Sequence, residues 1–546
     1  MSILNWPQTL LSIAVITFLV SKLQKWVQTK NKVPLPPQPP GLPFLGNMLD
    51  ILSATKIGQQ HLLFENWARK YGEVVRVEAG PFTQYFINSD SAAKELFDKQ
   101  SSATSERPRW IVSNEQICNE KNVLLLSASN PRWRHQRKVI LQGMTSVSRA
   151  DADLPYLHFE TAKFLNEVVN DPTLAASSAR IFNSIGRYTY STFASQTFGM
   201  ELPNADDPAI DYIFTSGLEQ ILGTLPGTYF VDILPILDHL PLFLKPWERK
   251  ARALFQDNLK WCLKQMRWVQ TAHQNNTSPD SFLSRVLQDE KMGFEDTSEA
   301  AYLAFMLIIG AADTSKMSTW SFLEAMMRFP EVQETARKHI EAKVGVADRL
   351  PVYEDLKEIP YVRYLMKEVW RWRPPVALGH PHTTTKELFY GGYRIPKGAR
   401  IHLNAWAIGH DPSRHLDPEL FSPERYEGDL TTSEESKNSS DVKERDHFAF
   451  GSGRRICPGY HVAERSLAVA IMRVVWAFEI VPSPQAKMPL DPRDYVGEMP
   501  GNPGECMPVM LRVRSEAKKR VIDREFRAAE ASRPVMIGKL KKLIGR

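Results

Sequence analysis

The chain has 546 residues, 43% of them hydrophobic and 24% charged, which is enough material for a large core around an interior cofactor. Its formal charge of +6 comes from the C-terminal end, because from Arg512 onward twelve lysines and arginines face four acids. The rest is close to neutral, which argues against a nucleic-acid partner. The four cysteines have no paired spacing, which argues against a zinc site or a secreted disulfide framework and favours a reducing compartment.

The first segment, residues 1–32, is predicted to be a membrane anchor with a basic flank. Residues 3–20 lack charged side chains and reach the shortest spanning lengths, since such helices need roughly 17 to 25 residues. Lysines follow this run and no charge precedes it, so the positive-inside rule places its C-terminal side in the cytosol. In a eukaryotic cell this predicts the endoplasmic reticulum membrane. A cleaved signal peptide is the alternative, but its basic residues would precede the apolar run.

Residues 33–47 are rich in proline and cannot form a helix or a central strand, since each proline fixes φ and lacks a backbone donor. We expect a stiff extended hinge that packs on the body, in preference to a disordered linker. The body has short β-like runs at Gly80–Ile87 and Tyr390–Ile401, and otherwise helical periodicity. The predicted fold class is therefore mainly α with a smaller β-rich region.

Two pairs of polar residues lie at helical spacing in the body. Trp133 and Arg137 share one face of a helix that an Asn-Pro pair would begin. Glu368 and Arg371 are neighbours on another helix, which an Arg-Pro-Pro sequence ends. On most helices an ion pair of this kind is solvated and contributes little to stability. The apolar residues that flank it here favour a buried position.

A long helix is predicted over residues 296–330, because an aspartate cap opens the segment and no proline interrupts it. Its middle contains Gly310, Ala311, Asp313 and Thr314. A glycine inside a helix costs about 1 kcal/mol relative to alanine, so its presence suggests that something approaches the backbone closely. The alternative is a buried helix with small residues for packing, in which Thr314 bonds to its own carbonyls.

Cys457 lies in a glycine-rich loop just before an apolar helical pattern. The free N–H groups of a helix N-terminus, together with Arg454 and Arg455, would favour an anionic sulfur. An isolated cysteine is more often an inert buried side chain, but the surrounding sequence favours a ligand. Before this loop, residues 427–446 are predicted to form an exposed insertion. Residues 516–546 form a basic C-terminal extension, expected to be a mobile solvated tail rather than a membrane-surface segment.

The cysteine loop resembles the haem-thiolate loop of the cytochrome P-450 superfamily, with no departure from the family pattern. The pattern's places are filled by Phe450, Gly453, Arg455, Cys457 and Gly459. The motif is highly specific, and the resemblance covers nearly the whole chain. It implies the cytochrome P-450 fold for a haem-binding catalytic domain at residues 48–515, behind a single N-terminal transmembrane helix.

The resemblance also implies a role for each group of residues. Cys457 would be the proximal ligand of haem b, iron protoporphyrin IX. The middle of the long helix resembles the family's oxygen-binding helix. There Gly310 and Ala311 would leave room for O2, while Thr314 would hold the activated oxygen and its water and Asp313 would deliver protons.

Further residues match positions that support the cofactor in this family. The donors to the haem propionates would be Trp133, Arg137, His382 and Arg455. A structural network behind the cysteine loop would consist of Glu368, Arg371 and Arg425. His382 could instead pair with His380 on a metal ion, but no third ligand lies at a suitable spacing.

By this resemblance the protein would be a monooxygenase that receives electrons from a separate NADPH-cytochrome reductase and oxidises a lipophilic small molecule. Arg134, Lys138 and Arg454 would belong to the docking face for that acidic partner. The substrate pocket would be formed by residues 107–123, 203–246, 302–310 and 376–379. The sequence around residues 391–398 and 446–450 resembles filamentous-fungal members that act in secondary metabolism.

Two other functions are compatible with a haem-thiolate protein. The first is a reductase-independent isomerase of the same fold, but members that rearrange peroxides often lack the threonine. The second is a haem sensor or electron carrier, which would need neither Asp313 nor Thr314. The presence of both residues therefore favours the monooxygenase.

Overall fold

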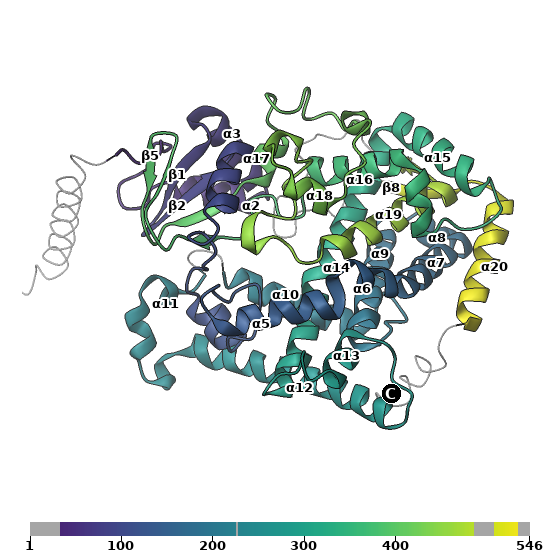
Figure 1. Cartoon of the computed structure of the whole chain (residues 1–546), viewed down its shortest axis with the longest axis horizontal. Coiled ribbons are helices and arrows are strands. Elements are labelled where there is room, and N and C mark those ends of the chain that lie inside the picture. Colours follow the sequence, from purple (N-terminus) through teal and green to yellow (C-terminus); the bar gives the residue numbers. More distant parts are fainter. Residues whose placement is uncertain (1–32, 225–227, 485–506, 533–546) are drawn as a thin grey trace, which may run out of the picture.

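A computed structural model describes residues 33–224, 228–484 and 507–532 (Figure 1). The predicted anchor at residues 1–32 and the end of the C-terminal extension lie outside the described residues. The larger helices are α2 (Met48–Lys56), α3 (Gln60–Tyr71), α5 (Pro131–Ile140), α7 (Leu154–Asn170), α9 (Ser178–Phe198), α10 (Pro208–Leu222), α12 (Pro246–Gln274), α14 (Thr297–Arg328), α15 (Pro330–Val344), α16 (Pro360–Trp372), α19 (Tyr460–Ala477) and α20 (Glu516–Ser532). Shorter ones are α4 (Asp90–Ala93), α6 (Val147–Ala152), α8 (Pro172–Ala175), α11 (Phe230–Ile233), α13 (Phe282–Gln288), α17 (Ala405–Gly409) and α18 (Ser433–Asn438).

The β-structure is small and gathers mainly at one side of the molecule, at the left in Figure 1. The strands are β1 (Val74–Ala79), β2 (Phe82–Ile87), β3 (His382–Thr383), β4 (Leu388–Tyr390), β5 (Tyr393–Ile395), β6 (Arg400–Leu403), β7 (Phe478–Pro482) and β8 (Val509–Val513). The main sheet has the order β1-β2-β6-β3, in which β2 and β6 run parallel and the other neighbours antiparallel. The pairs β4–β5 and β7–β8 are separate and antiparallel. The prediction of a mainly helical fold with a smaller β-rich region is confirmed.

Helix α14 lies in the middle of the molecule and confirms the long helix predicted from the sequence (Figure 1). Asp296 caps it by accepting a hydrogen bond from the N–H of Ser298 at 2.9 Å, and Pro330 opens the next helix. It packs against α9, α12 and α19 and contributes to both of the largest apolar clusters. Within the described ranges it is the one helix long and apolar enough to cross a membrane, but most of it is buried in the core.

The proline-rich hinge is extended and joined to the sheet region by its backbone. The carbonyl of Pro37 accepts a hydrogen bond from the N–H of Arg76 on β1 at 2.8 Å. The carbonyl of Pro34 accepts one from the N–H of Arg394 on β5 at 2.9 Å, and the Arg394 side chain bonds to the carbonyl of Val33. A disordered linker would not form these contacts, so the hinge holds a fixed path on the body.

One expectation about a polar segment was wrong, and another is confirmed only in part. Residues 516–532 are not a solvated tail but form α20, which packs against α7 and buries Val521 and Ile522 (yellow in Figure 1). The insertion at residues 427–446 is only partly exposed, because it contains α18 and buries both Ser436 and Asp446. In both segments only a few side chains are buried, and charged residues separate them. The sequence therefore shows no clear apolar face.

Candidate active site

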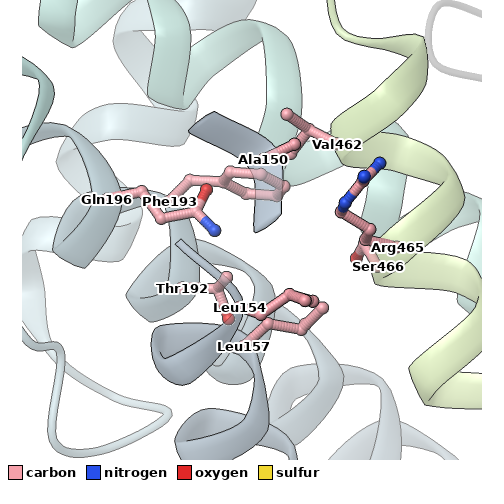
Figure 2. A pocket seen from close by; sticks show the side chains of 9 residues that line it. All are labelled: Ala150, Leu154, Leu157, Thr192, Phe193, Gln196, Val462, Arg465 and Ser466. Carbon is pink, nitrogen blue, oxygen red and sulfur yellow. The ribbon is translucent and has the colours of Figure 1, made fainter. Parts of the chain in front are cut away.

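A cavity of about 360 Å³ lies in the interior, between α5, α10, α14 and the cysteine loop. Each of the four segments predicted to form the substrate pocket contributes residues to its wall. A much smaller hollow of about 10 Å³ lies between α9 and α19 (Figure 2). It shares Phe193, Val462 and Ser466 with the large cavity, but it has room for about one water molecule. The large cavity is therefore the candidate site.

Cys457 lies where the sequence predicts, just before the N-terminus of α19, and its side chain opens into the cavity. Its N–H donates to the carbonyl of Phe450 at 2.8 Å, and the N–H of Gly459 donates to Sγ at 3.4 Å. Gly453 has a φ of 69°, and a Cβ there would lie only 2.1 Å from the carbonyl oxygen of Phe97. The loop can therefore follow this path only with glycine at that position.

The electrostatic surroundings of the sulfur differ from the expectation. Burial raises the pKa of the Cys457 thiol, while the Gly459 N–H and the Arg137 guanidinium lower it. Neither Arg454 nor Arg455 contributes, which corrects the prediction that these two arginines stabilise the thiolate. The Arg454 side chain points to solvent, and Arg455 donates to the carbonyls of Ser105 and Leu126. On balance the pKa of the thiol is raised, so burial outweighs the two groups that favour the anionic sulfur.

The middle of α14 forms another part of the cavity wall, including Gly310, Ala311, Asp313 and Thr314. A Cβ added at Gly310 would meet no atom within 4 Å, so the backbone faces open space. The Thr314 hydroxyl donates to the carbonyls of Gly310 and Ala311, at 2.9 and 3.3 Å, as the packing alternative expects. It nonetheless lines the cavity, and its second lone pair can accept a hydrogen bond there.

Asp313 is partly buried, and one of its oxygens, Oδ1, is buried and has no hydrogen-bond partner among the described residues. Desolvation raises the pKa of its carboxyl, while the Tyr190 hydroxyl that faces it and the Lys316 ammonium lower that pKa. A carboxyl with a raised pKa binds a proton more readily than an exposed one, which suits a group that hands protons on.

Three arginines line the cavity. Arg107 is buried and Arg137 and Arg455 are partly buried, and desolvation lowers the pKa of each guanidinium, for Arg455 to about 9. The charges of Arg455 and Arg137 lower the pKa of Arg107 further, while Glu106 raises that of Arg455 and Arg137 lowers it. The three guanidinium groups donate hydrogen bonds to backbone carbonyls. Such a cluster is suited to bind a ligand with more than one carboxylate.

The other two predicted propionate donors lie beside this cluster. Trp133 stacks against the Arg455 guanidinium, 4.3 Å from its ring centre, and shares α5 with Arg137. His382 also lines the cavity and donates its Nδ1–H to the carbonyl of Thr104 at 2.7 Å. Its Nε2 can donate only when the ring carries a second proton. Burial lowers the pKa of His382, so that state requires a nearby anion.

The Glu-Arg network is buried behind the cysteine loop, as predicted. Glu368 and Arg371 form an ion pair at 2.6 Å with no exposed side-chain surface, and Arg425 Nε lies 3.3 Å from Glu368. Arg371 also donates to backbone carbonyls between α16 and the loop. Trp370 on the same helix meets the Phe450 ring at 4.9 Å, which joins the network to the loop.

Haem b fits this cavity by three independent features. A cysteine sulfur opens into it, a glycine on α14 leaves space within it, and a cluster of three guanidinium groups lines it. Within the described residues no group of three His, Cys, Asp or Glu side chains is placed to hold a metal ion by itself.

Comparison with known proteins agrees with this geometry. The family model for cytochrome P450 matches residues 36–502. The chain belongs to the cytochrome P450 family. It is 54% identical to a cytochrome P450 monooxygenase of Gibberella fujikuroi, over 96% of this chain and 97% of that protein. It is 34% identical to cytochrome P450 monooxygenase virE of Hypocrea virens, over 82% and 78% of the two chains. It is 32% identical to cytochrome P450 monooxygenase verL of Clonostachys rogersoniana, over 94% of this chain and 93% of that protein.

These relatives show that the chain is a monooxygenase of fungal cytochrome P450 type, and proteins of this family bind haem b through a cysteine thiolate. Sequence reasoning missed two residues of the site. Arg107 was assigned only to the variable pocket, because its neighbours Glu106 and Arg109 are charged and give no sign that its side chain is buried. Tyr190 gave no signal, because it reaches Asp313 only when α9 packs on α14.

Proposed function

We propose that Cys457 holds the haem iron of this cytochrome P450, and that Trp133, Arg107, Arg137 and Arg455 bind the propionates. The observation that carries the proposal is that the sulfur, the acid-threonine pair and these arginines all line one cavity. When bound, haem supplies the iron at which O2 is activated. The family relatives support a monooxygenase over the isomerase and the sensor.

The chain's own residues supply protons and exclude water. Asp313 lines the cavity next to Thr314, and its carboxyl, whose pKa desolvation raises, would pass protons toward the Thr314 hydroxyl. Thr314 accepts at its free lone pair, while its own hydrogen bonds to Gly310 and Ala311 fix its rotamer. The apolar part of the cavity wall binds a lipophilic substrate and displaces water from the reacting centre.

Electrons would come from NADPH through a separate NADPH-cytochrome reductase. On α5, Arg134 and Lys138 point outward while Trp133 and Arg137 point into the site, and Arg454 is exposed on the cysteine loop. These three cations supply a positive face for an acidic partner close to the sulfur. Replacing Arg134 and Lys138 with glutamate should raise the KM for reductase several-fold with little change in substrate affinity. Unchanged reductase kinetics would contradict this face.

We further infer an attachment to the endoplasmic reticulum membrane, with the catalytic domain in the cytosol. The support within the described residues is a segment from the start of α11 to the start of α12 whose large apolar side chains are exposed. These are Phe230, Leu234, Ile236, Leu240, Leu242, Phe243 and Leu244. A soluble surface rarely gathers so much apolar area, whereas a lipid surface would cover it. Cell fractionation, with and without residues 1–32, measures the anchor directly. A substrate from fungal secondary metabolism is proposed from the sequence resemblance alone.

The central test is the spectrum of the reduced protein with carbon monoxide. The wild type should show the Soret band of a thiolate-ligated haem, and Cys457→Ala should abolish it. Cys262→Ala is the matched control, because that cysteine lies on α12, buried in an apolar cluster, and does not line the cavity. If Cys457→Ala keeps the band, the assignment of the ligand is wrong. Turnover that requires NADPH and reductase separates the monooxygenase from an isomerase.

A further inference from the structure

Gln220 and His380 are polar side chains of the cavity wall whose buried atoms include some without a hydrogen-bond partner in the described part of the chain. Gln220 comes from α10, and His380 follows α16. Neither residue has a role in holding the cofactor or in delivering protons to oxygen. A buried polar group is normally hydrogen-bonded, so each of them requires an explanation.

The orientation of the Gln220 amide is set by its neighbours. Asn122 Oδ1 accepts the N–H of Leu124 at 2.9 Å, so the Asn122 amide group must turn its NH2 toward Gln220. Its Nδ2 accordingly donates to Gln220 Oε1 at 2.9 Å, and the Cys118 thiol approaches the same oxygen at 3.2 Å. The Gln220 Nε2 therefore points away from both. It is fully buried, and no described residue accepts its hydrogens.

His380 presents a second unpartnered group to the cavity. Its ring stacks on Trp110, with the ring centres 5.4 Å apart and an angle of 23° between the planes. Its backbone carbonyl is held by Arg107 at 3.0 Å, but neither ring nitrogen has a partner among the described residues. Burial, and then the charge of Arg107, lower the pKa of the imidazole well below its ordinary value. The ring is therefore neutral and offers one donor and one acceptor.

One segment holds both side chains in the same part of the wall. Trp110, on which His380 stacks, donates its indole N–H to the carbonyl of Thr224 at 3.2 Å. The Ser113 hydroxyl donates to the carbonyl of Gln220 at 2.6 Å, one helical turn earlier. Residues 110–113 thus fix α10 and His380 relative to each other. Their polar atoms form a prearranged pair rather than two unrelated features.

We propose that Gln220 and His380 bind oxygen atoms of the substrate, so that this enzyme acts on a lipophilic molecule that already carries oxygen functions. Gln220 Nε2 donates to a carbonyl or ether oxygen, and His380 exchanges a hydrogen bond with a hydroxyl or a second carbonyl. This inference rests on the proposed monooxygenase function and names the substrate class. It also places the enzyme after a reaction that has installed the first oxygen atoms. A plain hydrocarbon would leave both groups unpaired.

The test measures how the haem-loaded full-length enzyme discriminates between matched ligands. Tetralin, 1-tetralone and 6-hydroxy-1-tetralone share one skeleton and differ only in oxygen functions. Their dissociation constants are obtained from the substrate-induced shift of the Soret band. In Gln220→Leu, the preference for 1-tetralone over tetralin should fall about fivefold to tenfold, because one hydrogen bond is lost. In His380→Phe, which retains the aromatic stack, the preference for the hydroxylated ketone over 1-tetralone should fall by a similar factor.

The controls separate a lost hydrogen bond from a disturbed pocket. Gln220→Glu keeps the oxygen used by Asn122 and Cys118 but removes the donor, so it should also lose the preference if Gln220→Leu folds poorly. Thr224→Val removes a hydroxyl that already bonds to the carbonyl of Ile221 at 2.7 Å, so it should leave the preference unchanged. Each variant must first show the carbon monoxide band of the wild type.

The outcomes distinguish this inference from the proposed function. If the variants keep both the band and the wild-type preferences, Gln220 and His380 do not bind the substrate and the inference is overturned, while the monooxygenase assignment stands. If His380→Phe alone loses the carbon monoxide band, His380 serves to hold the haem, and its part of the inference is overturned. If the wild type lacks the band, the proposed function itself fails.

Discussion

At the scale of single residues, the buried carboxyl of Asp313 gives a pH-dependent prediction. Its folded-state pKa is raised above 3.8, so the native protein binds this proton more tightly than the unfolded chain does. Stability therefore decreases as the pH rises above that value, and Asp313→Asn should reduce the decrease. Thermal melting between pH 4 and pH 7 measures the slope. Turnover of the variant should fall by about a hundredfold or more, since proton delivery is impaired.

Asp296→Asn is the matched control on the same helix. Hydrogen bonds from Ser298, against some desolvation, hold the pKa of the Asp296 carboxyl below its ordinary value. Its contribution has the opposite sign, because it is present at neutral pH and lost as the pH falls. Asparagine also caps helices well, so the fold should persist. An unchanged slope in Asp313→Asn would contradict the burial of that carboxyl.

The residues of the site differ in how far the sequence predicts them. Trp133 and Arg137 are four residues apart in one helix, so helical geometry alone joins them. Gln220 and His380 come from distant segments, and only tertiary packing places them on one cavity. The environment of Cys457 was predicted wrongly for the same reason. Sequence neighbours such as Arg454 can point away, while Arg137, far along the chain, approaches the sulfur.

At the scale of elements, the ion pair on α16 gives a second prediction. Arg371→Leu leaves the Glu368 carboxylate buried without its main partner, which costs about 3 to 5 kcal/mol of stability. The yield of haem-loaded protein, measured by the carbon monoxide band, should therefore collapse. Lys99→Ala breaks a mostly exposed pair with Glu95 at 3.0 Å and should have almost no effect. If Arg371→Leu and Lys99→Ala reduced the yield of haem-loaded protein equally, burial of the ion pair would not determine its contribution to stability.

Elements with strong end signals were predicted and the others were not. Asp296 and Pro330 delimit α14 because a cap and a proline act through local geometry. Strands β7 and β8 are short and pair across a long connection, and no local signal marks their partners. Helix α20 is rich in charge and buries only a narrow stripe, so it resembles a solvated tail until its docking surface is known.

At the scale of the whole molecule, α20 is attached to the helical body by side-chain hydrogen bonds. Lys518 bonds to Glu341 and to the carbonyl of Trp476, and Asp523 accepts hydrogen bonds from Asn166 and Asn170. Removal of residues 516–546 should lower the melting temperature by several degrees, since each buried aliphatic side chain contributes about 2 kcal/mol. Removal of residues 533–546 alone is the control. If both truncations melt alike, the docking of α20 contributes nothing to stability.

The arginine cluster has a consequence for how the polypeptide reaches its mature state. Arg455 donates a hydrogen bond to the carbonyl of Ser105, a residue 350 positions earlier. The positive charges of arginines from remote parts of the chain therefore come close together in the interior. A newly made chain that folds without haem must bring these like charges together with no propionates to neutralise them. Because haem binds the folded form, it should also shift the folding equilibrium toward that form by mass action. The supply of haem in the cell should then decide how much new polypeptide escapes proteolysis.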